Sequence, residues 1–334
     1  MNNAQSRSST GGTPAVEPAS PASIARAGAL IAAGRLVAFP TETVYGLGGD
    51  ATNEHAVAAI FEAKGRPSFN PLIVHFFDVA SAQSQAEFDA RAEELAAQFW
   101  PGPLTMVLPL RSGSSIARLA TAGLDTIAVR VPAHPVARAL LNAAARPIAA
   151  PSANRSGRIS PTAPIHVAEE MGDRVDMILA AGRTPVGLES TIVDLTGAEA
   201  RLLRPGAVTQ AEIESMIGPV ACAEDDSDRP VAPGQLRRHY APATKLRLNA
   251  RRAEPGEALL AFGPDPFAGR GAAAVLNLSE TGDLVEAAAN LFAMLRTLDT
   301  GGYAGIAVTP IPEKELGVAI NERLRRAAAD DTDG

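Results

Sequence analysis

The chain has 334 residues, of which 46% are apolar, so it is long enough for two globular domains with a buried core in each. Its formal net charge of −7 argues against a polybasic surface for nucleic acid or membranes, and no apolar run approaches the length of a membrane span. We therefore expect neither stable nucleic-acid binding nor a membrane contact. The single cysteine, Cys222, excludes an internal disulfide and a cysteine-based metal site, so we expect a cytoplasmic protein.

The N-terminal part of the chain changes from a polar leader to regular structure. Residues 1–22 are rich in Ser, Ala, Asn, Pro and Gly, a composition typical of a disordered leader. A first domain is expected over 23–217, and it opens with a helix at 24–33 that ends at Gly34. A short apolar run, Val37–Phe39, then predicts a buried strand.

The stretch after this strand, residues 40–50, is the first candidate site. Thr41, Glu42, Thr43 and Tyr45 supply hydroxyls and a carboxylate beside three glycines. Glycines allow a close approach of backbone or ligand, and the polar groups could hold a small polar molecule. The alternative is a hairpin or a left-handed turn that needs glycine only for its dihedral angles.

Alternating helix and strand patterns continue through the first domain. Helices are expected at 53–64, 86–99, 136–145, from 167 onward and at 210–217, and strands at 71–76, 105–110, 126–131, 148–150, 177–179, 187–194 and 201–204. A second polar turn, residues 151–162, follows the strand at 148–150. Two strands of this domain therefore end in unusual polar turns.

Residues 218–243 differ in composition and are expected to form a linker, with an acidic patch, prolines and a basic-aromatic cluster at 237–240. A smaller domain over 244–329 and a disordered tail at 330–334 should follow. Strands are expected at 258–262, 272–278 and 304–308, and helices at 283–298 and 316–328. This alternation predicts a small parallel, Rossmann-like sheet, and it carries no glycine pattern of a nucleotide site.

Four residues of the first domain could act on phosphate charge. Lys64 and Arg66 place a point charge and a planar fork in one turn, while Ser152 and Asn154 offer a hydroxyl and an amide with little bulk. For the first pair, the alternative is a solvated pair at a helix C-terminus. For the second pair, it is a local Ser or Asx turn.

Arg130 ends an apolar strand, where an anionic partner is favoured over a surface position. His75 and His239 have no partner at metal-ligand spacing, and no Cys/His or carboxylate cluster suggests zinc, so we expect no metal site. A serine hydrolase motif is also absent from the sequence. The chemistry that remains is the binding of anions and the polarisation of phosphate.

Seven motifs occur in the order found in the YrdC-like family. They are PTETVYGLG at 40–48, AKGRPSFNPLIVH at 63–75, WPGPLT at 100–105, VRVP at 129–132, APSANRSG at 150–157, ESTIVD at 189–194 and LRPG at 203–206. Within this family the chain resembles the threonylcarbamoyl-AMP synthases. The segment APGQLRRHYAP at 232–242 and the α/β region after it are similar to the long, two-domain form of these enzymes.

The resemblance implies a YrdC-like twisted open α/β sheet with a concave site, followed by the smaller Rossmann-like domain. It implies a nucleotidyltransferase that makes threonylcarbamoyl-AMP and pyrophosphate from L-threonine, bicarbonate and ATP, with magnesium. The product would serve threonylcarbamoyl-adenosine modification of tRNA, and the partner would be a downstream tRNA-modifying threonylcarbamoyl transferase complex.

The resemblance also assigns individual residues. L-threonine would contact Thr43, His75, Arg130, Ala150 and Ser190, and ATP would contact Arg66, Asn70, Thr126, Ser152, Ser160, Arg204 and Tyr240. Lys64, Arg66, Ser152 and Asn154 would form the catalytic set that stabilises charge on the α-phosphate. The linker at 218–243 would close as a lid, with His239 and Tyr240 over the nucleotide, and an ordinary interdomain tether is the alternative.

Two other function classes remain open from the sequence. A concave basic face could bind RNA, although the net charge of −7 and the lack of interleaved aromatic and basic residues count against it. A YrdC-like domain can also adenylate a carbamate in hydrogenase maturation. This chain has no cysteine-rich zinc segment and no acylphosphatase-like N-terminal region, which counts against that role.

Overall fold

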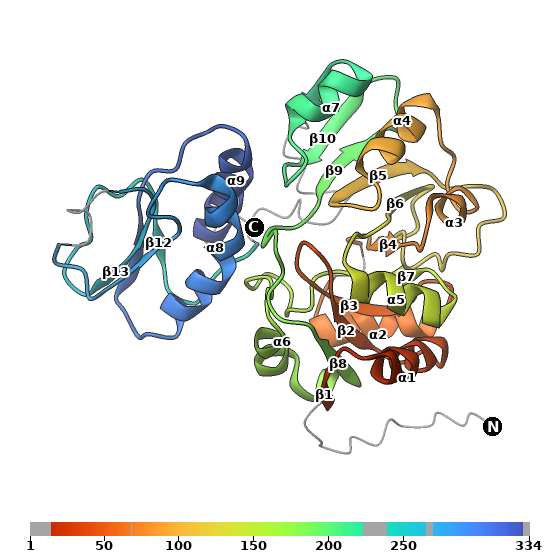
Figure 1. Cartoon of the computed structure of the whole chain (residues 1–334), viewed down its shortest axis with the longest axis horizontal. Helices are drawn as coiled ribbons and strands as arrows, with labels where there is room; N and C mark the ends of the chain where they lie inside the picture. Colours follow the sequence, from red (N-terminus) through yellow and green to blue (C-terminus); the bar gives the residue numbers. More distant parts are fainter. Residues whose placement is uncertain (1–14, 68, 223–238, 265–269, 330–334) are drawn as a thin grey trace.

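The computed structural model describes residues 15–67, 69–222, 239–264 and 270–329. They form an α/β protein with two sheets, of eleven and four described strands. Figure 1 shows the larger sheet and its helices on one side and the smaller sheet on the other, with α8 and α9 between them. None of the helices in these residue ranges is long and apolar enough to cross a membrane.

The larger sheet is mixed and carries the first domain. In spatial order its strands are β1 (Ala15–Pro18), β8 (Met177–Ala180), β2 (Val37–Pro40), β3 (Tyr45–Asp50), β7 (Ile148–Ala149), β4 (Ile73–His75), β6 (Thr126–Arg130), β5 (Leu104–Pro109), β9 (Thr191–Asp194), β10 (Ala200–Arg204) and β11 (Val220–Cys222). Its helices are α1 (Pro21–Ala32), α2 (Glu54–Lys64), α3 (Val79–Gln83), α4 (Ala90–Phe99), α5 (Pro135–Ala144), α6 (Pro164–Met171) and α7 (Gln210–Ile217), with a short 3₁₀ turn, η1 (Gly172–Arg174).

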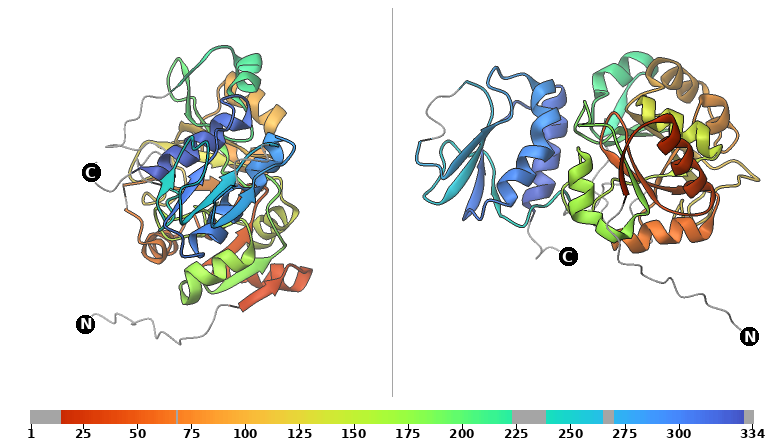
Figure 2. Two further views of the ribbon diagram at one scale, coloured as in Figure 1. Left: turned by 90° about the vertical axis from the view of Figure 1, so that its left-hand side faces the viewer. Right: turned by 60° about the horizontal axis from the view of Figure 1, so that its bottom comes forward.

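The smaller sheet is parallel throughout, as expected from its alternation of strands and helices. Its order is β12 (Leu246–Arg247), β15 (Gly305–Val308), β13 (Glu257–Ala261) and β14 (Ala274–Asn277), with α8 (Leu284–Asp299) and α9 (Leu316–Ala328). Figure 2 shows both helices on the face of this sheet that looks toward the larger domain.

The two domains share a hydrophobic core. Val44, Leu188 and Tyr240 are buried in one cluster with side chains of the smaller domain, including Phe292 of α8 and Ile320 of α9. Because these residues come from the first polar turn, the position just before the ESTIVD motif and the end of the linker, the smaller domain packs directly behind the candidate site.

Local sequence signals explain how α2 is placed. The side chain of Asn53 accepts hydrogen bonds from the backbone N–H groups of His55 and Ala56, so it caps the first turn as expected. Gly65 ends the helix with φ of 60°, a left-handed conformation that favours glycine. The chain therefore turns sharply between Lys64 and Arg66.

The glycine-rich stretch that we expected to be a turn is largely a strand. Residues 45–50 pair antiparallel with β2 in a hairpin, so only residues 41–44 form the turn, and none of the three glycines has a positive φ that would require glycine. A Cβ atom on Gly48 would lie 2.8 Å from the Phe39 ring and 2.9 Å from the Ile148 side chain. This glycine is therefore needed for packing between neighbouring segments rather than for ligand approach.

Three further expectations need correction. Within the expected leader 1–22, residues 15–18 form β1, which pairs in parallel with β8, and α1 begins at Pro21. Within the expected linker 218–243, residues 220–222 form β11 and extend the larger sheet beside β10. The helix expected over 86–99 begins at Ala90, where Asp89 caps it. Residues 1–14, 223–238 and 330–334 lie outside the described ranges.

Candidate functional site

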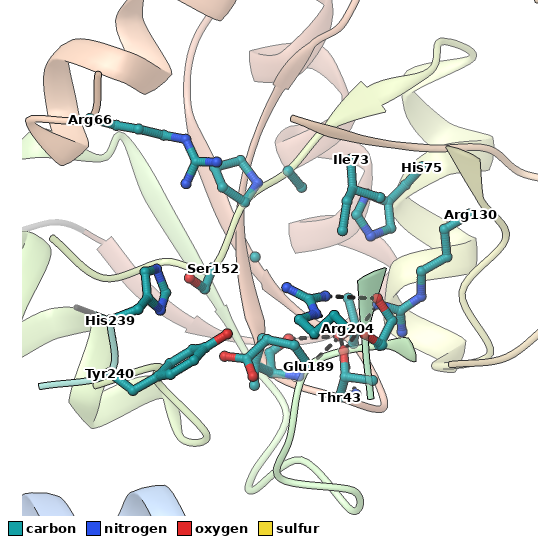
Figure 3. A pocket seen from close by; sticks show the side chains of 16 residues that line it. Thr43, Arg66, Ile73, His75, Arg130, Ser152, Glu189, Arg204, His239 and Tyr240 are labelled. Atoms are coloured by element: carbon teal, nitrogen blue, oxygen red, sulfur yellow. Dashed lines mark hydrogen bonds between the residues drawn. The ribbon is translucent and has the colours of Figure 1, made fainter. Parts of the chain in front are cut away.

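A cavity lies where the two polar turns meet, and most of the expected site residues line it (Figure 3). Nine of the expected residues line this cavity: Thr43, Arg66, His75, Arg130, Ala150, Ser152, Ser190, Arg204 and Tyr240. The other lining residues are Thr41, Val44, Gly46, Ile73, Pro151, Glu189 and His239. The cavity has a volume of about 40 Å³, enough for a few water molecules but far too small for a nucleotide.

Sheet topology explains why residues so distant in sequence meet here. Strands β4 and β6 are parallel and His75 is in register with Arg130, so both side chains leave the sheet at the same end. An isolated bridge between Gly46 and Ser152 joins β3 to the second polar turn. Ser190 stands just before β9. The site therefore gathers at one edge of the central strands, as is common for sites in α/β sheets.

One end of the cavity is built around a buried ion pair. The Arg130 guanidinium donates to the Glu42 carboxylate, to the Thr43 hydroxyl (3.1 Å) and to the Gly102 carbonyl (3.2 Å). Although burial alone would raise it, the pKa of Glu42 is lowered by the charge and hydrogen bond of Arg130. These bonds leave one N–H group on each terminal nitrogen of Arg130 without a described acceptor, a pair suited to a carboxylate.

His75 is neutral at this end of the cavity. Burial, with a smaller contribution from Arg130, lowers the pKa of His75 to about 3. Its Nδ1 atom is buried and has no hydrogen-bond partner among the described residues. An orphaned polar atom of this kind is costly unless a ligand or water satisfies it, so His75 is available to a polar group in the cavity.

The opposite end is electropositive. Arg66 donates to the backbone carbonyls of Asn70 (3.2 Å) and Pro71 (3.0 Å) and to the side-chain oxygen of Asn70, all of them neutral acceptors. Burial and the nearby charge of Arg204 lower the pKa of Arg66 to about 10. Burial lowers the pKa of Arg204 as well. Two buried guanidinium groups that repel each other form a site that an anion would stabilise.

Lys64 lies behind the cavity wall rather than in it. Its side chain is buried, and Nζ donates to the backbone carbonyls of Ser152 (2.6 Å) and Asn154. Burial, followed by the charge of Arg66, lowers the pKa of Lys64 to about 7. Of the four residues expected to form the catalytic set, Arg66 and Ser152 line the cavity, whereas Lys64 and Asn154 support the turn that carries Ser152.

Asn154 and two of the expected ATP contacts are held close to the cavity by neighbouring residues. The Asn154 amide donates to the carbonyls of Arg155 (2.8 Å) and Arg158 (2.9 Å), which fixes the second polar turn. Asn70 accepts from Arg66, and Ser160 donates to the lining residue Glu189.

The structure does not bring Thr126 to the cavity. Thr126 begins β6, whereas the cavity-lining Arg130 ends it. Four residues of extended strand separate the two positions by about 13 Å. Contact of Thr126 with ATP therefore stays a prediction without support from this geometry.

One charged lining residue, Glu189, was given no role from the sequence, although it stands directly before Ser190 in the ESTIVD motif. Thr41, which belongs to the first candidate stretch, lines the cavity and hydrogen-bonds Thr43 (2.8 Å). The signal for Glu189 is that its buried carboxylate lies near the charges of Arg204 and Arg323. Only the fold brings these two arginines close to it. The residue that pairs with Glu189, Arg323 of α9, carries no motif and could not have been found from the sequence.

Family models match both domains of the chain. The model of the Sua5, YciO and YrdC proteins, described as telomere recombination, matches residues 29–206. The model described as threonylcarbamoyl-AMP synthase, C-terminal domain, matches residues 208–329. Together the two matches cover the larger sheet and the parallel α/β domain behind it.

Relatives along nearly the whole chain carry the same name. A threonylcarbamoyl-AMP synthase of Pyrococcus abyssi is 43% identical over 322 residues, which are 90% of this chain and 93% of that protein. One of Bacillus subtilis is 39% identical over 321 residues, 91% of this chain and 92% of that protein. The crystal structure of P. abyssi Sua5 complexed with L-threonine matches with a TM-score of 0.86 at 40% identity, over 94% of this chain and 96% of that one. The chain therefore belongs to the threonylcarbamoyl-AMP synthase family.

Proposed function

We propose that the protein is an L-threonylcarbamoyladenylate synthase, which makes threonylcarbamoyl-AMP and pyrophosphate from L-threonine, bicarbonate and ATP for threonylcarbamoyl-adenosine modification of tRNA. The observation that carries this function is a single cavity with two chemically different ends. One end holds the Glu42–Arg130 pair, and the other holds the buried cations Arg66 and Arg204. An amino acid and a triphosphate need these two environments side by side.

The first end suits L-threonine. The two remaining N–H groups of Arg130 can take the α-carboxylate, and the orphaned Nδ1 of neutral His75 can meet a polar group of the same ligand. Thr43 adds a hydroxyl and Ala150 an apolar wall, and Ser190 lies where the two ends meet, because its hydroxyl accepts a hydrogen bond from Arg204 (3.1 Å). That the related P. abyssi protein was crystallised with L-threonine supports this assignment.

The second end suits the phosphates of ATP. Arg66 and Arg204 supply fixed positive charge in a buried setting, where it is stronger than in water. Ser152 offers a hydroxyl between the two ends, and Tyr240 and His239 form an aromatic wall. Lys64 acts from behind by holding the carbonyls on both sides of the Ala153 peptide, which keeps Ser152 in place.

The chemistry is a nucleotidyl transfer that needs no protein nucleophile. The threonine amine takes up carbon dioxide from bicarbonate to give a carbamate, and a carbamate oxygen attacks the α-phosphorus of ATP while pyrophosphate leaves. Positive charge from Arg66 and Arg204 offsets the charge that develops on the phosphate oxygens. Catalysis would then depend on positioning and electrostatics, since binding at the two ends of one cavity would hold both substrates in a fixed orientation.

Magnesium would accompany ATP rather than occupy a protein site. Within the described ranges, no group of three or more His, Cys, Asp or Glu side chains could hold a metal ion. The lining carboxylate Glu189 already accepts a hydrogen bond on each oxygen, from Ser160 and Arg323. The residues present therefore fit a magnesium ion held mainly by the triphosphate, where it would neutralise phosphate charge.

The small cavity implies that a wall moves when substrates bind. Tyr240 is fully buried and stacks on Phe292 with ring centroids 5.5 Å apart, so its ring forms a fixed part of the cavity wall. Exclusion of water would protect the carbamate, which is unstable in water. The product would pass to a tRNA-modifying threonylcarbamoyl transferase complex, the class of enzyme that consumes an activated carbamoyl group.

Pyrophosphate release tests the proposed function directly. The purified protein is incubated with ATP and magnesium, and pyrophosphate is measured with and without L-threonine and bicarbonate. We expect release that requires both co-substrates, with threonylcarbamoyl-AMP detected by mass spectrometry. RNA binding that weakens with salt, without threonine-dependent pyrophosphate release, would instead support a nucleic-acid-binding role.

A further inference from the structure

The smaller domain reaches the cavity through one buried arginine. Arg323 of α9 is fully buried, and its Nε donates to Glu189 (2.9 Å) while one terminal nitrogen donates to the Pro205 carbonyl (3.0 Å). The other terminal nitrogen pairs with Glu322 of the same helix. Two of these three acceptors belong to the first domain, so the guanidinium crosses the domain boundary.

Both cavity residues that Arg323 touches lie at the electropositive end. Glu189 lines the cavity and also accepts from Ser160, and Tyr240 lines it with its ring 5.2 Å from the Arg323 guanidinium carbon. Arg66 and Arg204 also interact electrostatically with Tyr240. Thr43 and Arg130, at the other end, have no described contact with Arg323. The influence of Arg323 is therefore expected on one ligand only.

A carboxylate in this position needs an explanation. Glu189 lines the cavity beside Arg204 (Figure 3), where an unpaired negative charge would repel a triphosphate. Arg323 supplies the compensating charge from behind the wall. The pair keeps Glu189 as a hydrogen-bond acceptor that orients Ser160 while the cavity stays positive.

Tyr240 is held in a strained backbone conformation. Its φ is 62°, in the left-handed region that an aromatic residue adopts only under constraint. The constraint comes from the ring stack on Phe292, the Arg323 guanidinium, and a hydrogen bond from the Ala241 N–H to the Gly157 carbonyl (2.9 Å). The Tyr240 hydroxyl is buried without a partner among the described residues, so it remains available to a ligand.

We infer that Arg323 is a positioning residue for the nucleotide end of the cavity: it neutralises Glu189 and holds the Tyr240 ring against the site. This inference rests on the proposed function, since it assigns ATP to that end. It gives the smaller domain a direct part in the reaction. Without this domain, the cavity would lose the counter-charge of Glu189 and the support of Tyr240.

The test compares Arg323→Gln with wild type by calorimetric affinities for ATP and L-threonine and by the KM for each in pyrophosphate release. We expect the affinity for ATP to fall about tenfold, because Glu189 is left unpaired beside the phosphates, while the affinity for L-threonine stays within about twofold. If Arg323→Gln only loosened the contact between the two domains, it would lower the active fraction and weaken the binding of ATP and of L-threonine alike. Equal losses for the two ligands would overturn the inference.

Two further variants keep the test decisive. Adding Glu189→Gln to Arg323→Gln removes the unpaired carboxylate, and most of the ATP affinity should return, whereas a double variant no better than the single one would overturn the inference. If Arg323→Gln does not fold, Arg323→Lys keeps the charge but reaches fewer acceptors, and it should weaken ATP alone. ATP affinity equal to wild type in that variant would equally overturn it.

A matched control lies on the same helix. Arg325 also carries a positive charge on α9, but it is exposed and pairs with the exposed Glu313 (2.7 Å), and it has no described contact with a cavity residue. Arg325→Gln should leave the affinities for ATP and L-threonine unchanged.

Pyrophosphate release by the wild-type protein separates the proposed function from the role of Arg323. An inactive wild type would refute the proposed function, whereas an active wild type with an unaffected Arg323→Gln would refute only the role of Arg323.

Discussion

Replacing Lys64 with Met should change how the stability of the protein depends on pH. In the folded protein, burial and the charge of Arg66 lower the pKa of Lys64 from 10.5 to about 7. Between these two values the unfolded chain holds a proton on Lys64 that the folded chain does not. Stability therefore rises with pH in this window, and the cost of burying the charged amine is fully present below pH 7.

The size of the effect on stability follows from the pH range between the folded and unfolded pKa values of Lys64. A proton held only by the unfolded chain changes the free energy of unfolding by up to about 1.4 kcal/mol per pH unit. From pH 7 to pH 9, wild type should gain up to about 2 to 3 kcal/mol relative to Lys64→Met, since Met cannot titrate. The gain has a structural basis: a neutral amine keeps two N–H groups, which match the carbonyls of Ser152 and Asn154.

Urea unfolding at pH 7, 8 and 9 measures the effect as a difference between the two proteins. The other titrating groups are common to both, so they cancel in the comparison. Parallel pH profiles would refute the lowered pKa of Lys64.

A second readout uses ATP, whose charge should raise the pKa of Lys64 again. Binding at pH 8 should then take up a proton, seen as a buffer-dependent binding enthalpy in wild type and lost in Lys64→Met.

Four further predictions concern the cavity. Arg66→Ala should raise the barrier to turnover by about 2 to 4 kcal/mol with circular dichroism unchanged, because a fixed charge on the phosphates is lost; a near-normal turnover number would rule out this role. Arg130→Lys should not rescue Arg130→Ala in calorimetric L-threonine binding, because an ammonium cannot reproduce a two-pronged carboxylate contact; equal loss of ATP and threonine affinity would indicate a structural arginine. Removal of all residues after 217 should leave a folded first domain with little synthase activity, because the wall formed by Tyr240 is lost. A fragment that works at full rate would contradict the need for the smaller domain. In the full chain, hydrogen exchange at residues 239–242 should slow when ATP and threonine bind.

Much of the fold could be predicted from local patterns. Asn53 and Gly65 mark the two ends of α2, and α7 runs over 210–217 as expected, because caps and apolar spacing act within a few residues. The short strands β1 and β11 were missed, since they form only by pairing with β8 and β10 and have little apolar signal of their own.

The sequence by itself determined which residue types are available to the site and their order along the chain. The polar turns after β2 and β7, the cations of residues 64–66 and the motifs shared with a known family are all local features. The residues were enough to indicate phosphate chemistry, because each motif keeps its chemical groups at fixed short spacing, and the resemblance to a known family added the amino acid substrate.

Only the tertiary structure decided which of these groups face the cavity. It places Arg66 in the wall and Lys64 behind it, although they are two residues apart, because the left-handed turn at Gly65 reverses the chain between them. It also brings Arg323 to Glu189 across 134 positions of sequence. Such a contact depends on how one domain packs on another, and no local pattern of residues encodes it.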